Sequence, residues 1–92
     1  MKQYYIYKTT NLINQKQYIG KHYGELNDSY LGSGKLIKKA IAKYGKENFQ
    51  KEILCIVQNN EEANLKEKEF IEYYNAVKCV NFYNLHESGY GG

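Results

Sequence analysis

Two short runs of aromatic and β-branched residues flank a polar segment near the N-terminus of this chain. The runs, residues 1–10 and residues 17–21, are rich in tyrosine and isoleucine, which favour strands. A polar, asparagine-rich segment, residues 11–16, lies between them. Strand-forming runs on both sides of such a segment predict a β-hairpin. We expect the chain to leave the sheet over residues 21–24.

The predicted hairpin brings tyrosines together on one of its faces. Alternate side chains of a strand share a face, so Tyr5 and Tyr7 point one way and Ile6 points the other. Tyr7 and Tyr18 are then expected to meet across the hairpin. Such a pair is either a packed aromatic contact or a proton-handling pair, and the residue types alone leave both interpretations open.

The middle of the chain predicts a loop followed by a helix. Residues 25–34 are polar and contain glycine, and residues 35–44 place apolar side chains at offsets of three and four. Ser33 is the expected N-cap and Gly45 the expected left-handed C-cap. The lysines lie off the apolar stripe, so they form either a solvated face or a DNA-backbone contact. They are Lys35, Lys38, Lys39 and Lys43.

The second half of the chain predicts a strand and a longer helix. Residues 49–57 contain an unbroken apolar run from Ile53, which predicts a strand buried on both faces, the inner or best-covered strand of the sheet. In the following helix, residues 61–74, Glu67 falls on the same stripe as Ala63 and Ile71. A carboxylate on an inward stripe is costly unless it is paired or binds a metal. Glu67 therefore either lies at the edge of the stripe, against a lysine or a tyrosine hydroxyl, or has a functional role.

Composition and charge narrow the possible partners. Ninety-two residues make one small domain, residues 1–92, and no apolar run approaches the length of a membrane span. The net charge is +3 and every basic residue is lysine, which suits contact with a phosphate backbone better than recognition of guanine edges. Cys55 and Cys79 lack metal-site spacing, and we expect a reducing cytoplasm.

Several segments together resemble the GIY-YIG nuclease superfamily. Tyr5-Ile6-Tyr7 is similar to its first signature, with tyrosine in place of the first glycine, and Tyr18-Ile19-Gly20 matches its second. Further matches follow in the family's order. They are Lys43-Tyr44-Gly45, Asn48-Phe49, Glu67 three residues before Phe70-Ile71, and Tyr83-Asn84. The resemblance spans nearly the whole chain and implies an α+β fold, a small three-stranded antiparallel sheet flanked by helices.

The resemblance also implies a chemistry, the metal-dependent hydrolysis of DNA phosphodiesters. By this similarity one Mg²⁺ or Mn²⁺ would lie on Glu67, with Glu69 as the competing ligand. Tyr7 would be the general base and Tyr18 would position the water or the phosphate. The remaining implied roles belong to Lys21 as a cation near Tyr7, His22, Asn84 as an amide donor, and Tyr30 in the DNA-contacting loop. Since the chain has no arginine, Lys21 and His22 are the candidates to replace the arginine and histidine of other members.

A second hypothesis from another class stays open. A nucleic-acid-binding module with little or no catalytic power would also use tyrosines to stack bases and lysines to follow phosphates. The inward Glu67 separates the two hypotheses, because a binding module has no use for a carboxylate that faces phosphate. Both predict DNA as the partner, and a separate specificity domain or partner protein is compatible with either.

Overall fold

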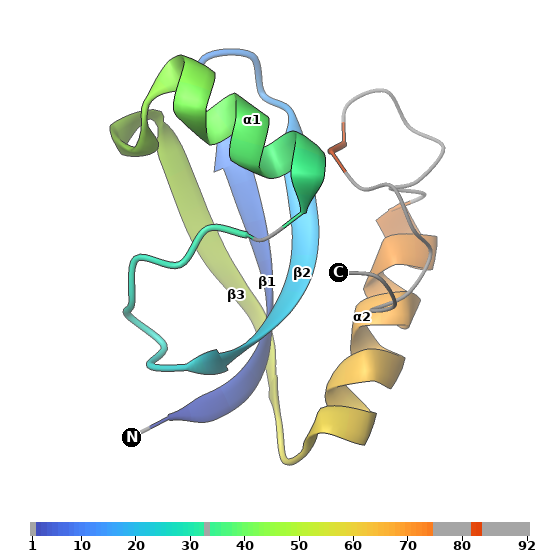
Figure 1. Ribbon diagram of the computed structural model, residues 1–92. Helices are drawn as coiled ribbons and strands as arrows, with labels where there is room; N and C mark the ends of the chain where they lie inside the picture. The colour runs from blue at the N-terminus through green and yellow to red at the C-terminus, as the bar shows by residue number, and fades with distance from the viewer. Residues whose placement is uncertain (1, 33, 75–81, 84–92) are drawn as a thin grey trace.

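A computed structural model describes residues 2–32, 34–74 and 82–83 of the chain. Three strands form one antiparallel sheet in the order β2-β1-β3, with two helices against it (Figure 1). The elements are β1 (Gln3–Asn11), β2 (Gln17–Gly24), α1 (Lys35–Tyr44), the short 3-10 helix η1 (Lys46–Asn48), β3 (Phe49–Val57) and α2 (Asn60–Tyr74). The predicted fold class, a small three-stranded antiparallel sheet flanked by helices, is confirmed.

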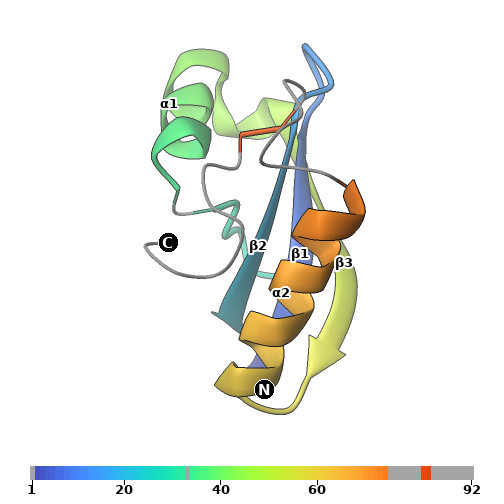
Figure 2. The same cartoon turned by 90° about the vertical axis from the view of Figure 1, so that its right-hand side faces the viewer.

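The central strand β1 separates two small cores. Figure 2 shows α1 and α2 on opposite faces of the sheet. Tyr5 and Tyr7 pack on the α1 side with Tyr18 and Ile37, whereas Ile6 packs on the α2 side with hydrophobic residues of the other elements. The alternation of β1 therefore places both signature tyrosines on one face, as predicted.

The hairpin is longer than the sequence indicated. Residues 21–24 were expected to leave the sheet, but β2 continues to Gly24, which pairs with Gln3. The physical reason is cross-strand packing, because the rings of Tyr23 and Tyr4 lie 4.5 Å apart on adjacent strands. The extension places Lys21 and His22 on a paired strand instead of in a loop.

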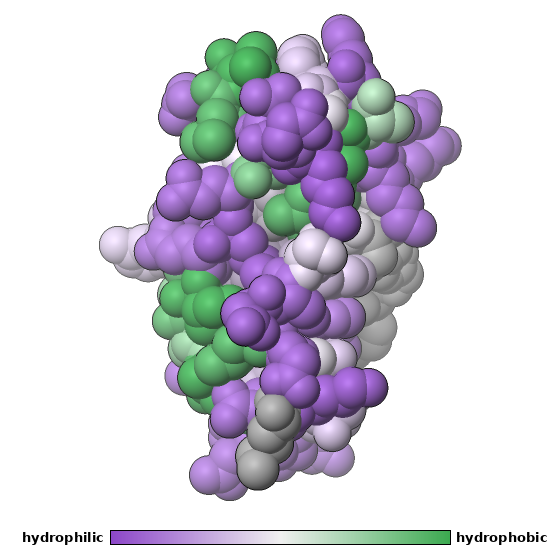
Figure 3. All heavy atoms as spheres, turned by 90° about the vertical axis from the view of Figure 1, so that its left-hand side faces the viewer, coloured by the Kyte–Doolittle hydropathy of each residue, from purple (hydrophilic) through white to green (hydrophobic). Residues whose placement is uncertain are grey.

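The prediction for β3 was wrong. We expected the inner or best-covered strand, buried on both faces, but β3 is an edge strand and the side chain of Ile56 is 52% exposed. An apolar run reports side-chain type only, and the central position belongs to β1, which pairs on both sides. Figure 3, which views the molecule from the β3 side, shows separate hydrophobic patches within a mainly hydrophilic surface.

Cap residues are identified at both ends of α1 and at the N-terminal end of α2. The N-cap of α1 is Gly34, and the expected cap Ser33 lies outside the described residues. Gly45 has a positive φ of 91° and donates its N–H to Ile41, which ends α1 as expected. Asn59 caps α2 by accepting the N–H of Glu62 at 2.8 Å. None of the helices in the described part of the chain is long and apolar enough to cross a membrane.

Candidate active site

The site is built around the phenol of Tyr7, which reaches over the neighbouring strand. Tyr7 pairs with Gly20 of β2, and a Cβ at Gly20 would lie 2.5 Å from the Tyr7 hydroxyl. Only a residue without a side chain leaves room for the phenol at this point. Gly20 therefore allows the Tyr7 hydroxyl to lie against β2, which forms the edge of the sheet.

Three tyrosine rings meet at this point. The Tyr18 ring lies 6.2 Å from the Tyr7 ring at an angle of 45°, and the Tyr30 ring lies 5.8 Å from it, edge to face. Gly32, whose φ is 146°, packs against the Tyr18 ring, and Gly34 packs against the hydroxyl of Tyr18. The predicted meeting of Tyr7 and Tyr18 is confirmed, and the glycines of the loop are explained by close approach to Tyr18.

Glu67 approaches the same strand from the other face of the sheet. Helix α2 lies beside β2 in Figure 1, and the Glu67 side chain is buried, with 6% exposure. Its charge raises the pKa of both Tyr7 and Tyr18, so the carboxylate and the two phenols share one electrostatic environment. The sequence-based placement of Glu67 on the inward stripe of the helix is confirmed.

One carboxylate oxygen of Glu67 lacks a partner. The main chain of Lys21 forms a hydrogen bond with the carboxylate, but Oε1 is buried and accepts no hydrogen bond from the described residues. Burial raises the pKa of Glu67 to about 7, and the Lys21 charge and hydrogen bond oppose this only in part. A buried oxygen without a partner is energetically costly, and a bound proton or cation would lower this cost.

The phenols are held in the neutral form at neutral pH. Burial raises the pKa of Tyr18 to about 12, and the charge of Glu67 adds to this effect. Burial also raises the pKa of Tyr7 well above its ordinary value, and Tyr18, Tyr30 and Glu67 raise it further. A positive charge bound at Glu67 would oppose the rise that the Glu67 charge causes in the pKa of both phenols.

The described contacts of Lys21 and His22 are with groups other than the Tyr7 phenol. The Lys21 ammonium donates to Asn60 at 3.1 Å, at the start of α2, and its charge acts on Glu67. The His22 ring stacks on Tyr30 at 3.7 Å, with its Nε2 3.3 Å from the Asp28 carboxylate. Burial lowers the pKa of His22, and Lys51 also lowers it, while Asp28 raises it. The His22 ring therefore packs against Tyr30 and helps to hold it in place.

A partly buried ion pair behind the tyrosines was missed by the sequence analysis. The Lys51 ammonium contacts the Asp28 carboxylate at 2.6 Å and the Tyr5 hydroxyl at 2.8 Å. Burial raises the pKa of Asp28, but hydrogen bonds from Lys51, the Tyr30 main chain and Tyr5 outweigh burial and leave it below its ordinary value. One signal was present in the sequence, because the period of two along β3 puts Lys51 on the same face as Phe49 and Ile53.

The other predicted site residues are exposed, half-buried or outside the residues that the structure describes. Lys35, Lys38 and Lys39 are all exposed on α1, and contact with DNA stays a prediction for them. Tyr30 is only half-buried, and DNA contact stays a prediction for it too. Asn84 lies outside the described residues.

Comparison with known proteins decides the family. Residues 27–86, more than half of the chain, match the family described as "Putative endonuclease segE, GIY-YIG domain". This chain belongs to the segE-type GIY-YIG family. The signatures Tyr5-Ile6-Tyr7 and Tyr18-Ile19-Gly20 accordingly lie on β1 and β2 of a GIY-YIG domain.

The relatives of this GIY-YIG domain come from Enterobacteria phage T4. The chain is 50% identical over 90 residues to "Putative endonuclease segE" and 41% identical over 92 residues to "Endonuclease segA". These alignments cover 97% and 99% of the chain but 43% and 41% of the relatives. The chain thus spans about two fifths of the length of the curated relatives it matches.

A solved structure shares the fold. The catalytic domain of intron endonuclease I-TevI, determined as a mutant, superimposes with a TM-score of 0.67 and 20% sequence identity. The match covers 95% of this chain and 96% of that domain. The arrangement of strands and helices in this GIY-YIG domain is therefore that of the I-TevI catalytic domain.

Proposed function

We propose that this GIY-YIG domain is a DNA endonuclease domain that hydrolyses phosphodiester bonds with a divalent metal. The observation that carries the proposal is the carboxylate of Glu67, which has one unpartnered, buried oxygen in the same environment as the Tyr7 and Tyr18 phenols. Relatives named as endonucleases and the shared fold of an endonuclease catalytic domain support it.

The donor set fits Mg²⁺ or Mn²⁺. No group of three or more histidine, cysteine or acidic side chains forms within the described residues, so a site at Glu67 would rest on one carboxylate. Mg²⁺ suits such a site because it keeps several waters and needs few protein ligands. When bound, the metal supplies positive charge that neutralises the scissile phosphate and stabilises the leaving oxygen. Zinc, which favours several nitrogen or sulfur ligands, fits poorly.

The protein side chains would divide the remaining work. Tyr7 would accept the proton of the water that attacks phosphorus, while the 3′-oxygen leaves. The raised pKa keeps the Tyr7 phenol protonated, and a protonated phenol is not a base. Tyr7 would therefore need positive charge near Glu67 to form the phenolate that accepts this proton. Tyr18 would position the attacking water or the phosphate. Lys21 acts on Glu67 through its main-chain hydrogen bond and its charge, and this holds the carboxylate at the edge of β2.

The lysines of α1 are suited to guide the DNA backbone toward this site. The helix begins at Gly34, which packs against the Tyr18 hydroxyl, so Lys35 is adjacent to the site in the chain. Lys38 and Lys39 extend the exposed charge along the helix. Lysine contacts phosphate as a point charge, which positions the backbone without selecting a base sequence.

Cleavage of supercoiled plasmid tests the proposal. We expect the parent protein to nick or linearise plasmid with Mg²⁺ and not with a chelator, and Glu67→Gln and Tyr7→Phe to lose this activity. Glu69→Gln is the matched control, because Glu69 lies on the same helix but is exposed and paired with Lys66. Plasmid that is bound and retarded, but never cut, would instead identify a nucleic-acid-binding module.

A further inference from the structure

Lys51 is a half-buried lysine whose three ammonium N–H groups all have acceptors. Its side chain is 9% exposed, and the Nζ donates to the Tyr5 hydroxyl at 2.8 Å, the Asp28 carboxylate at 2.6 Å and the Asp28 carbonyl at 3.1 Å. A lysine has three N–H donors, so these three acceptors complete its hydrogen bonding. The contacts join β3 to β1 and to the loop that follows β2.

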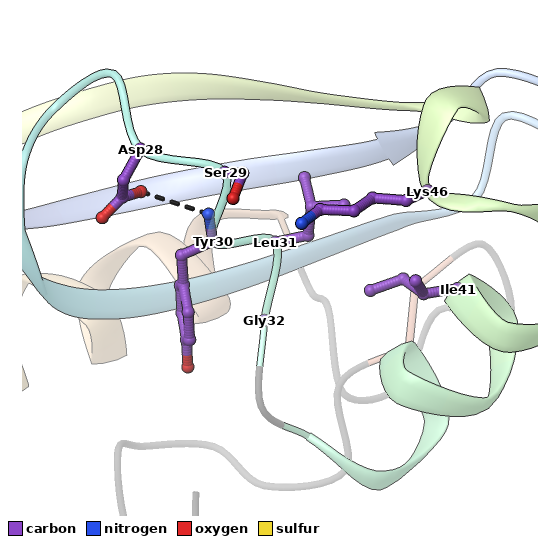
Figure 4. A pocket seen from close by; sticks show the side chains of 7 residues that line it. All are labelled: Asp28, Ser29, Tyr30, Leu31, Gly32, Ile41 and Lys46. Atoms are coloured by element: carbon purple, nitrogen blue, oxygen red, sulfur yellow. Dashed lines mark hydrogen bonds between the residues drawn. The ribbon is translucent and has the colours of Figure 1, made fainter.

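The Asp28 carboxylate links Lys51 to Tyr30. Its Oδ1 accepts the main-chain N–H of Tyr30 at 3.2 Å, the bond drawn in Figure 4, and its Oδ2 lies 3.3 Å from the imidazole of His22. The His22 and Tyr30 rings are parallel within 7°. The Tyr30 ring then meets Tyr7 edge to face, and a hydrogen bond joins the two side chains.

The loop has little support on its outer side. A hollow of about 450 Å³ lies against residues 28–32, bounded by Ile41 and Lys46 (Figure 4). The loop is held from its inner side, where Asp28 accepts the Tyr30 N–H, Thr9 donates to the Leu31 carbonyl at 2.7 Å, and Tyr30 and Leu31 pack on the core. Of these contacts, the Asp28 carboxylate is the one that bonds directly to Tyr30, and Lys51 is the cation that holds this carboxylate.

We propose that Lys51, acting through Asp28, is a positioning residue that sets Tyr30 against Tyr7 for DNA cleavage. The inference rests on the proposed function, because Tyr7 is the group whose geometry it controls. Lys51 touches neither Tyr7 nor Glu67 in the described contacts, and it acts through the loop. A misplacement of about 1 Å at a catalytic group costs roughly 100-fold in rate, which sets the expected effect.

The first test compares Lys51→Met with Lys8→Met. Lys8 is a matched control, because it is also a half-buried strand lysine, paired with Glu52 at 3.6 Å. We expect kcat of plasmid cleavage to fall about 100-fold in Lys51→Met while the Kd for DNA stays within about two-fold. Lys8→Met should retain the kcat of the parent. A Lys51→Met protein that cuts as fast as the parent overturns the inference.

The second test asks whether Lys51 acts through Asp28. In a cycle with Asp28→Asn, the double variant should lose no more kcat than the more damaging single variant, because both act on one unit. Losses that multiply would show that Lys51 acts by another route. The double variant leaves no unpaired buried charge, so it keeps the test valid if Lys51→Met does not fold.

The third test measures the stacking of His22 on Tyr30 instead of the rate of DNA cleavage. Stacking on Tyr30 should move the His22 Cε1 proton upfield in the NMR spectrum, and the shift should disappear in Lys51→Met but persist in Lys8→Met. A slow Lys51→Met protein that keeps the His22 shift contradicts the route through Tyr30. A parent protein that never cuts DNA overturns the proposed function together with this catalytic role, whereas a cutting parent with a normal Lys51→Met overturns this role alone.

Discussion

Replacing Glu67 by glutamine should make the folded protein more stable at alkaline pH while removing its cleavage activity. The reason is that burial raises the pKa of Glu67 from 4.5 to about 7. Below pH 4.5 the carboxyl is protonated in both the folded and the unfolded state, so it costs nothing. Between these values the unfolded state loses the proton first, and the folded state becomes progressively less favoured until the pH passes 7.

The size of the effect follows from the two pKa values. One pKa unit is about 1.4 kcal/mol, so the full cost of the ionised Glu67 above pH 7 is about 3 kcal/mol. Integrated between pH 5 and pH 8, the loss specific to Glu67 is about 2.5 kcal/mol. The glutamine amide adds a separate cost, because a buried N–H without an acceptor is unfavourable by about 1–3 kcal/mol, but that cost does not depend on pH.

Urea unfolding of the parent and of Glu67→Gln at pH 5 and pH 8 measures the effect. Other titrating groups, including His22, are common to both proteins, so their contributions cancel in the difference between the two proteins. We expect the free energy of unfolding of Glu67→Gln relative to the parent to rise by about 2.5 kcal/mol from pH 5 to pH 8. A difference that stays constant across this range would refute the assignment of Glu67 as a buried, unpaired carboxyl.

Two further predictions concern the geometry of the site and the DNA-binding face. Gly20→Ala should reduce cleavage about 100-fold, because the new Cβ would lie 2.5 Å from the Tyr7 hydroxyl and displace it. The circular dichroism spectrum should stay unchanged, and full activity would show that this close approach is not needed. Replacing Lys35, Lys38 and Lys39 together by glutamine should weaken DNA binding and lower the slope of log K against log salt by about 3, measured by fluorescence anisotropy; an unchanged slope would place the DNA elsewhere.

The features that the sequence predicted well depend on local periodicity. The period of two in β1 placed Tyr5 and Tyr7 on one face, and the helical offsets of α2 placed Glu67 on the buried stripe. Both conclusions need only the geometry of one element. The resemblance to GIY-YIG nucleases added the family, which the comparison with segE-type domains shows independently.

The features that were missed depend on contacts between distant segments. An unbroken apolar run could not show that β3 pairs on one side only, because pairing partners are set by the whole sheet. The ion pair of Lys51 and Asp28 joins residues 23 positions apart in the chain, and no local pattern links them. The stacking of His22 on Tyr30 and its approach to Asp28 depend on the loop conformation, which no local pattern shows, and a catalytic role of His22 stays a prediction.

The proposed metal site at Glu67 is tested most directly by titration with paramagnetic Mn²⁺, followed by NMR. We expect Mn²⁺ to broaden the amide signals of Gly20 and Lys21 first, in the parent and in the control variant Glu69→Gln. The selective broadening should be absent in Glu67→Gln. Broadening that centres on other residues, or that survives unchanged in Glu67→Gln, would contradict a metal site at the edge of β2.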